Sequence, residues 1–303
     1  MRKGVSATAK AASDIGFCPL GEVMSWTALL GDFLTECFMP SEKEAAIFYG
    51  AFINPKANWR KLIRAQLLDL RRFGALPACD LYVTVTNHCG VDGVQEFFEG
   101  LPISIKHIEY GDENKFEYPA LATLWRIVAT NDRYKYVGYL HTKGMSYAQN
   151  QRIKVEKVLT YFTFSAWTKV FQIFESHPDI NKIGIFPSME SGKPCGGLWF
   201  NFWWARSSLI RALPMPVETK DRYYYEHWIG SLSRKDPPIL DVHSLYTSDK
   251  TLFTGQEAID HLTDLRKRMK YKRHSILDEI MDLFIDIRRM SINAKEADDA
   301  PHP

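Results

Sequence analysis

Residues 134–147 read YKYVGYLHTKGMSY, and this stretch decides how the rest of the chain is interpreted. Its first half, YKYVGYL, is an apolar run with the length of a buried strand. The run ends abruptly in His141, Thr142, Lys143 and Gly144. Such polar groups at the end of a core strand are typical either of a ligand-binding edge or of a solvated turn.

The segments around this strand alternate between strand and helix patterns. Strands are expected at 45–52 (AAIFYGAF), 79–87, 101–110 and 134–140, and helices at 57–74, 92–100 and 117–130. This alternation predicts βαβ units and an α/β fold, with a mostly parallel sheet covered by helices on both faces. In such sheets ligands bind beyond the carboxyl ends of the strands, which is where we expect residues 141–144.

The second half of the chain continues the pattern less regularly. We expect one long helix at 151–176, a strand at 181–188, a loop at 190–197 (ESGKPCGG), short helices at 207–213 and 222–232, and a last strand at 237–246. Six basic side chains at 266–273 then precede apolar residues at helical spacing. We therefore divide the chain into an N-terminal extension (1–44), a catalytic domain (45–250) and a helical C-terminal extension with a disordered end (251–303).

Composition narrows the class of protein. The 303 residues are 46% hydrophobic, which suffices for one large core, and a net charge of +2 gives no indication of a nucleic-acid partner. Five scattered cysteines, without paired spacing, argue against a disulfide framework or a structural zinc site. Because no apolar run approaches the roughly 20 residues that cross a bilayer, we expect a cytoplasmic protein, with peripheral membrane contact as an alternative.

The polar strand end supplies the first candidate site residues. Lys143 can place a positive charge against a phosphate, and Gly144 allows the backbone to come close. His141 can donate a hydrogen bond or bind a metal ion. The alternative is a polar turn in which Lys143 is simply solvated.

Two downstream segments add candidates. GGLWFNFWWARSS (196–208) combines flat aromatic faces, which stack on sugars and bases, with polar contacts; its candidates are Gly197, Asn201, Trp203, Trp204 and Arg206. An aromatic core strand is the alternative. In YYYEHWIG (223–230), Glu226 lies among aromatic residues beside His227 and Trp228, and burial there would raise its pKa toward that of a general base. Its alternative role is a charge that stabilises the start of a helix.

In combination, YLHTKG, NFWWARS and EHWIG resemble motifs of the nucleotide-diphospho-sugar glycosyltransferases of the GT-A fold, over about residues 45–246. More narrowly they resemble a microbial glycosyltransferase-like group and, more loosely, rhamnan-synthesis proteins with an HTK motif. The resemblance implies hexosyl or deoxyhexosyl transfer from a nucleotide sugar to a hydroxyl of a glycan or glycolipid, as in polysaccharide biosynthesis. It also implies a donor site over the strand ends at Tyr49, Gly50, Asn87 and 141–144, with Trp203 and Trp204 holding the acceptor or the donor sugar.

The chain departs from this family at the metal motif. GT-A enzymes generally hold Mn²⁺ or Mg²⁺ through DxD carboxylates, where this chain has His-Thr-Lys. Hard cations prefer oxygen ligands, and an ammonium would repel them. We therefore expect Lys143 and His141 to replace the ion electrostatically. His243, after the last strand, keeps a metal-dependent alternative open.

The resemblance assigns Glu226 to deprotonate the acceptor hydroxyl, with Asp221 as a weaker candidate. Glu113, Asn114 and Glu117 are spaced to reach the same edge, but for Glu117 we favour stabilisation of the start of its helix over a ligand role. Inversion is assumed, because no residue pattern determines the stereochemistry. The main alternative is a non-catalytic nucleotide-sugar or carbohydrate-binding protein on the same fold. A nucleotidyltransferase is disfavoured because no glycine-rich phosphate loop follows AAIFYGAF.

The basic tail has two interpretations. Residues 264–290 could contact an anionic membrane surface, where a glycolipid acceptor would lie, or pack on the domain or a second subunit. Acidic residues at 278, 279, 282 and 286 favour packing, because they would be repelled by an anionic surface.

Overall fold

The computed structural model describes residues 42–143, 153–234, 240–248 and 250–271. The chain divides into two units, Met1–Glu42 and Lys43–Pro303, and the structure described below is that of the second. Gly144, most of the segment 264–290 and the C-terminal end therefore lie outside the described residues.

Strands of the second unit form one large sheet and one hairpin. The large sheet contains β1 (Ala45–Phe52), β2 (Cys79–Thr86), β3 (His107–Gly111), β4 (Tyr136–His141), β5 (Lys182–Gly184), β8 (Trp203–Arg206) and β9 (Val242–Ser244). The hairpin pairs β6 (Pro187–Glu190) with β7 (Lys193–Leu198). The helices are α2 (Trp59–Arg72), α3 (Ala75–Ala78), α4 (Val94–Glu99), α5 (Tyr118–Thr130), α6 (Ile153–Phe164), α7 (Trp167–Ser176), α8 (Ser207–Ala212), α9 (Arg222–Trp228) and α10 (Gly255–Tyr271), with a 3₁₀ turn, η1 (Trp199–Asn201).

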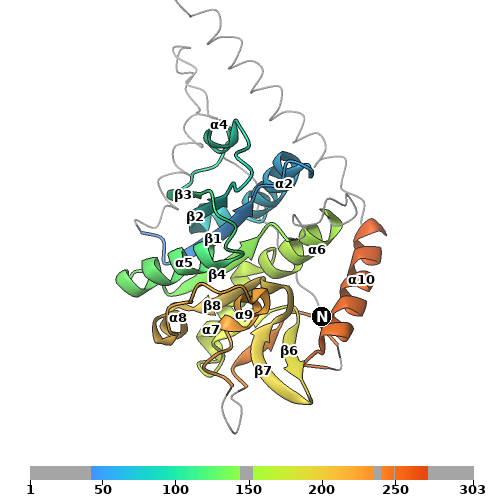
Figure 1. The fold of residues 1–303 in the computed structure, drawn as a ribbon. Helices are drawn as coiled ribbons and strands as arrows, with labels where there is room; N and C mark the ends of the chain where they lie inside the picture. The colour runs from blue at the N-terminus through green and yellow to red at the C-terminus, as the bar shows by residue number, and fades with distance from the viewer. Residues whose placement is uncertain (1–41, 144–152, 235–239, 249, 272–303) are drawn as a thin grey trace, which may run out of the picture. The chain divides into compact units, whose positions relative to one another are not determined.

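The predicted α/β fold is confirmed. The sheet order is β3-β2-β1-β4-β8-β5-β9, and only β8 runs antiparallel to its neighbours (Figure 1). The sequence did not predict this reversal, because an apolar strand has the same pattern in either direction. It arises from the turn η1, which sends the chain from the hairpin back into the sheet.

Three element predictions are wrong in detail. The strand expected at 101–110 begins only at His107, and the long helix expected at 151–176 is two helices separated near Ala166. The segment 190–197, expected to be a loop, forms most of the β6–β7 hairpin, whose turn has positive φ at Ser191 and Gly192.

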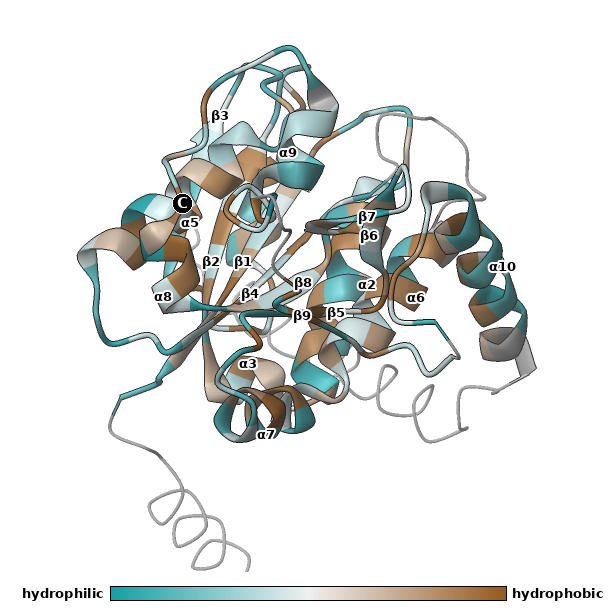
Figure 2. Cartoon of the chain, turned by 90° about the horizontal axis from the view of Figure 1, so that it is seen from below, coloured by the Kyte–Doolittle hydropathy of each residue, from teal (hydrophilic) through white to brown (hydrophobic). Residues whose placement is uncertain are grey.

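Helices cover both faces of the sheet, because alternate strand residues enter two different cores. Ile47 and Tyr49 of β1 belong to the core shared with α2 and α6, whereas Ala46 and Phe48 belong to the core shared with α5, α8 and α9. Figure 2 shows the central strands mainly as hydrophobic and the outer side of α10 mainly as hydrophilic. Burial on both faces explains why β1 is apolar throughout. Strand β2 is buried along its whole length too, although it includes Asp80, Thr84 and Thr86.

The strand order reverses between β1 and β4. From β1 the chain proceeds outward through β2 and β3, then returns to pair β4 with the other side of β1. Thr142 joins the two strand ends, because its amide donates to Gly50 O at 2.9 Å and its Oγ1 accepts from the Phe52 amide at 2.8 Å. In open α/β sheets the crevice at such a reversal is where ligands bind.

The described part of the C-terminal segment belongs to the same core. Helix α10 packs against α6, and its Ala258, Leu262 and Leu265 are buried with residues of α2 and α6. No helix in the described ranges is both long and apolar enough to cross a membrane.

Candidate functional site

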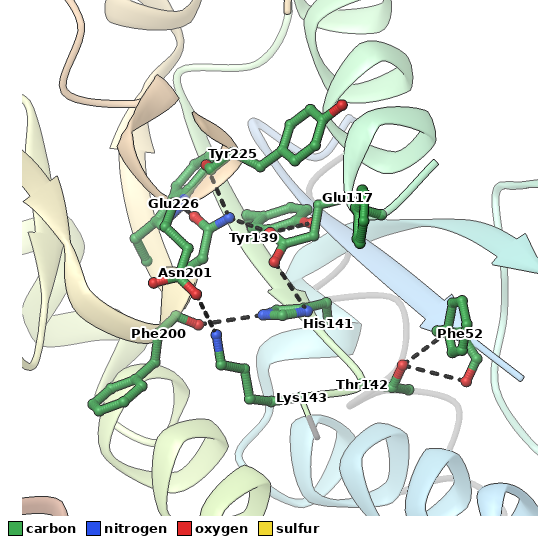
Figure 3. A network of polar contacts seen from close by, with 12 residues as sticks. Phe52, Glu117, Tyr139, His141, Thr142, Lys143, Phe200, Asn201, Tyr225 and Glu226 are labelled. Atoms are coloured by element: carbon green, nitrogen blue, oxygen red, sulfur yellow. Dashed lines mark hydrogen bonds and ion pairs between the residues drawn. The ribbon is translucent and has the colours of Figure 1, made fainter. Parts of the chain in front are cut away.

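Four charged or titratable side chains converge at the carboxyl end of β4 (Figure 3). His141 and Lys143 come from the strand end, Glu117 lies just before α5, and Glu226 is on α9. Each keeps between 12 and 17% of its side-chain surface exposed, so the group is sheltered but reachable from solvent.

Lys143 and Glu226 form an ion pair across the site. Lys143 Nζ lies 2.7 Å from Glu226 Oε1, although the residues are 83 positions apart in the chain. The His141 Nε2 lies 3.3 Å from the Phe200 carbonyl oxygen, and its ring stacks on Tyr139 of the same strand. The structure thus brings together all three residues that were predicted to be catalytic.

Glu226 lies at this position because its helix, α9, packs closely on β7 through glycine backbones. A Cβ at Gly230, just beyond α9, would lie 2.5 Å from Cys195 O and from Gly197 N on β7. Only glycine permits this approach. Gly197 was predicted to contact substrate; it is buried, and its neighbours are the backbone of α9 and Ser188. In this structure Gly197 and Gly230 let the helix that carries the carboxylate pack closely on β7, and the substrate contact of Gly197 stays a prediction.

Glu117, for which the sequence favoured a role at the start of a helix, lies inside the cluster. Tyr139 donates its hydroxyl to Glu117 Oε2 at 3.3 Å, Asn201 Nδ2 donates to the same oxygen, and His141 Nδ1 lies 3.6 Å from Oε1. Burial, together with the nearby charge of Glu226, raises the pKa of Glu117 to about 7, although Lys143, Asn201 and Tyr139 oppose the rise. Its position in the segment between the strand predicted at 101–110 and Pro119, in the first turn of the next helix, was the signal available in the sequence.

The pKa of Glu226 is shifted the other way. Burial alone would raise the pKa of this carboxyl, but the charge and hydrogen bond of Lys143, with His141 and His227, outweigh burial and lower it. The physical ground for expecting a raised pKa at Glu226 is therefore wrong for this structure. Two neighbouring carboxyls with pKa values shifted in opposite directions are typical of acid–base sites.

Backbone strain is concentrated around these groups. Four described residues other than glycine have positive φ, namely Phe116, Ser191, Phe200 and Asn201. Phe116 precedes Glu117, Phe200 presents its carbonyl to His141, and Asn201 binds Glu117. Only Ser191, in the hairpin turn, lies elsewhere. Such conformations cost of order 1–3 kcal/mol each and are often found at functional sites.

Gly50 makes room for the cluster. It lies opposite His141 in the β1–β4 register. A Cβ there would approach the Cβ of Ala120 at 3.1 Å and that of His141 at 3.3 Å. Glycine therefore allows α5 and the end of β4 to come together, consistent with its predicted place beside the site.

Several aromatic residues predicted to contact substrate are core residues. Each is at most 1% exposed, and each polar atom bonds internally: Tyr49 to Gln66, Trp203 to Asn201, Trp204 to Thr163 O and Trp228 to Pro214 O. Trp203 and Trp204 therefore lie in the core, and the prediction that they hold the acceptor or the donor sugar stays a prediction. Asn201, predicted as a substrate contact, is buried between Glu117 and Tyr225 O, where it connects the site to α9.

Other predicted contacts have structural partners. Arg206 pairs with Tyr136 in the register, at the opposite end of β4 from the cluster, and its Nε donates to Ile180 O at 2.8 Å. Asn87 closes a loop through two 2.9 Å bonds to Val91. His227 faces the hairpin, with Nε2 3.2 Å from Glu190 Oε1.

The residues at the site do not fit Mn²⁺ or Mg²⁺. Lys143 lies against the Glu226 carboxylate, where a cation would have to bind. Across the part of the chain that the structure describes, no group of three or more His, Cys, Asp or Glu side chains is placed to hold a metal ion. His243 is on β9, three strands from β4, and its charged neighbours are His177 and Lys169. The prediction that it belongs to a metal site at the strand end is therefore not supported.

Replacing Glu117 by glutamine should remove a pH-dependent loss of stability. In the folded protein the pKa of Glu117 is raised from 4.5 to about 7. The folded state therefore binds the Glu117 proton more tightly than the unfolded state does. The stability that this proton contributes is fully present below pH 4.5 and is lost as pH rises through about 7. Linkage makes this loss about 3 kcal/mol. Urea unfolding from pH 4 to 8 should show Glu117→Gln gaining stability relative to the wild type as pH rises. Glu113→Gln, an exposed change in the same loop, is the control; parallel curves for Glu117→Gln and the wild type would contradict the expectation.

Comparison with known proteins gives structural similarities only. No protein-family model matches the chain, and no curated protein sequence matches it. One similar solved structure is assigned as a nucleotide-diphospho-sugar transferase from Desulfovibrio desulfuricans (13% identity, 74% of this chain and 78% of that chain, TM-score 0.32). Another is a 4-diphosphocytidyl-2C-methyl-D-erythritol synthase (10% identity, 73% and 98%, TM-score 0.38). A third is core-mannan synthase A of Aspergillus fumigatus in its Mn/GDP form (11% identity, 67% and 73%, TM-score 0.29). At these TM-scores the similarity does not establish an activity.

Proposed function

We propose that this chain is a glycosyltransferase that moves a sugar from a nucleotide-activated donor to a hydroxyl of a glycan or glycolipid. The observation that carries the proposal is the group Lys143, Glu226, His141 and Glu117 at the point where the strand order reverses. This group combines a cation for phosphate with carboxyls whose pKa values are shifted apart. The resemblance of the HTKG, NFWWARS and EHWIG motifs to GT-A enzymes supports the same class.

Lys143 is the proposed contact for the diphosphate of the donor. Its side chain reaches into the site from a strand end that Thr142 anchors to β1. A fixed ammonium stabilises the negative charge that develops on a leaving diphosphate. His141 is placed to add a hydrogen bond.

Glu226 is the proposed proton acceptor. The acceptor oxygen forms a bond to the anomeric carbon, the bond from that carbon to the diphosphate oxygen breaks, and the hydroxyl proton passes to the Glu226 carboxylate. Displacement of this kind inverts the anomeric configuration. With its pKa near 7, Glu117 is largely neutral below neutral pH and holds the site together through Asn201 and Tyr139.

A second candidate is a non-catalytic binding protein for nucleotide sugars. The closed pair of Lys143 and Glu226 favours it, because a satisfied ion pair is also a stable resting arrangement. The proposal has three further parts. Transfer of a hexosyl or deoxyhexosyl group depends on the donor. A role in polysaccharide biosynthesis, and contact of residues 264–290 with a membrane or a second subunit, depend on the acceptor.

A screen of nucleotide sugars by thermal shift and slow hydrolysis tests the proposal. We expect at least one to stabilise the protein and be hydrolysed, also in the presence of EDTA. Lys143→Met should lower the hydrolysis rate by about 10²–10³-fold, because a preorganised charge is lost. Lys115→Met, which removes a lysine paired with Glu113 and Glu218 outside the cluster, is the control.

The contrary outcomes are distinct. Stabilisation without turnover would identify a binding protein. The absence of any stabilisation would overturn both readings, and activity that EDTA abolishes and Mn²⁺ restores would overturn the metal-free role of Lys143.

A further inference from the structure

The cation that a phosphate ligand requires is already paired in this structure. Lys143 Nζ lies 2.7 Å from Glu226 Oε1, and the two side chains keep 17% and 14% of their surface exposed. A ligand diphosphate and Glu226 therefore compete for the same ammonium. This competition has consequences that a solvated lysine would not have.

The backbone beneath Lys143 is anchored, so an exchange of partners has to come from its side chain. The Lys143 amide donates to His141 O at 2.8 Å, and Thr142 is bonded to Gly50 and Phe52 of β1. The flexible stem of a lysine can swing its ammonium between nearby anions without moving this backbone.

Glu226 is held in place more firmly. Helix α9 begins at Asp221, whose side chain caps it, and ends beside Gly230 in close contact with β7. Asn201 also binds Tyr225 O on this helix at 3.2 Å. The backbone that carries the carboxylate is therefore fixed to β7 and to Asn201 if the ammonium turns to another anion.

We propose that Lys143 is exchanged between Glu226 and the diphosphate of the donor, so that the ion pair opens when the donor binds and Glu226 acts as proton acceptor only in the loaded site. This inference rests on the proposed function and specifies how the same site is controlled. In the free site the ammonium neutralises Glu226 and makes it a weak base. In the loaded site the carboxylate loses its nearest cation while it stays sheltered, so its affinity for a proton rises.

The charged groups around Glu226 determine whether the carboxyls gain or lose protons when a diphosphate binds. Lys143 and His141 lie on the β4 side, Glu117 at the start of α5, and His227 on α9 itself. A diphosphate brings further negative charge to this group. Both carboxyls then bind protons more tightly, so ligand binding and proton uptake are coupled.

Binding of inorganic pyrophosphate, GDP and UDP to wild type, Glu226→Gln and Lys143→Met tests the exchange. Glu226→Gln removes the competitor and should tighten binding at least about tenfold, in line with the coupling of close charge pairs. Lys143→Met should abolish binding. Glu218→Gln removes a carboxylate that pairs with Lys115 instead, and it controls for the general loss of a negative charge.

A measurement on the unaltered chain supports the test if Glu226→Gln does not fold. Isothermal titration calorimetry with GDP at pH 8, in two buffers of different ionisation enthalpy, should show net proton uptake. At this pH the phosphates of GDP are fully ionised and cannot take up the proton themselves without a change in their own pKa.

Two results would overturn the exchange. Glu226→Gln binding no tighter than Glu218→Gln would show that Glu226 does not compete for Lys143, and so would the absence of proton uptake. Failure of the proposed function is distinguishable, because no nucleotide sugar would then be turned over while pyrophosphate would still bind more tightly to Glu226→Gln. If pyrophosphate, GDP and UDP bind neither wild type nor Glu226→Gln, the exchange is also wrong.

Discussion

Glu226→Gln is expected to lower the turnover of the nucleotide-sugar donor by about 10²–10⁴-fold while the donor stays bound at least as tightly as in the wild type. Glutamine keeps the size and the hydrogen-bonding oxygen of the side chain but cannot accept the hydroxyl proton. It also leaves Lys143 without its carboxylate partner at 2.7 Å, which frees the ammonium for the diphosphate. A fall in kcat combined with an unchanged or lower KM is therefore the expected signature.

Initial rates over a range of donor concentrations measure both parameters. Glu218→Gln, an exposed carboxylate outside the cluster, should behave like the wild type. A Glu226→Gln protein with full turnover would remove Glu226 as proton acceptor. A variant with weaker donor binding and unchanged kcat would instead assign Glu226 to ground-state binding.

Lys182→Met should destabilise the folded protein by about 3–5 kcal/mol. Lys182 at the start of β5 is fully buried, with Nζ 2.7 Å from Asp241 Oδ1 and 2.5 Å from Ser233 Oγ. Ser233 donates to the same Asp241 oxygen at 2.9 Å, and burial lowers the pKa of the lysine. Methionine fills the space but leaves the buried carboxylate without its cation.

Urea unfolding at constant pH, with the m value compared, measures the loss. Lys106→Met is the control, because Lys106 also pairs with a carboxylate, Asp80, but keeps 48% of its side chain exposed and should cost at most about 1 kcal/mol. The double variant Lys182→Met/Asp241→Leu should recover much of the stability, since removing both charges removes the desolvation cost. A Lys182→Met loss no greater than that of Lys106→Met would show that Asp241 finds another partner.

The Lys182 cluster also illustrates what periodicity cannot reveal. In NKIGIFPS the lysine has the position of a strand residue, and nothing within the segment shows that it is buried. Its partners come from the turn after α9 and from the residue before β9. Burial of a charge is decided by such distant groups, because only they can satisfy it.

Local pattern alone was enough for the elements that form the site edge. AAIFYGAF is β1 over the predicted residues, and the apolar run before HTKG is β4, because strands buried on both faces are continuous apolar segments. The alternation of strands and helices then placed His141 and Lys143 at a carboxyl edge. That edge was predictable because ligands of parallel α/β sheets bind beyond the carboxyl ends of the strands, whatever the individual residues are.

The sequence by itself thus determined the α/β architecture and the edge at which polar groups collect. Only the tertiary structure decided that Lys143 pairs with Glu226, that Glu117 joins them with a raised pKa, and that Trp203 and Trp204 lie in the core. The physical reason is that strand and helix patterns depend on burial along one segment. Charge pairing and pKa depend instead on the groups that other segments bring within a few ångströms.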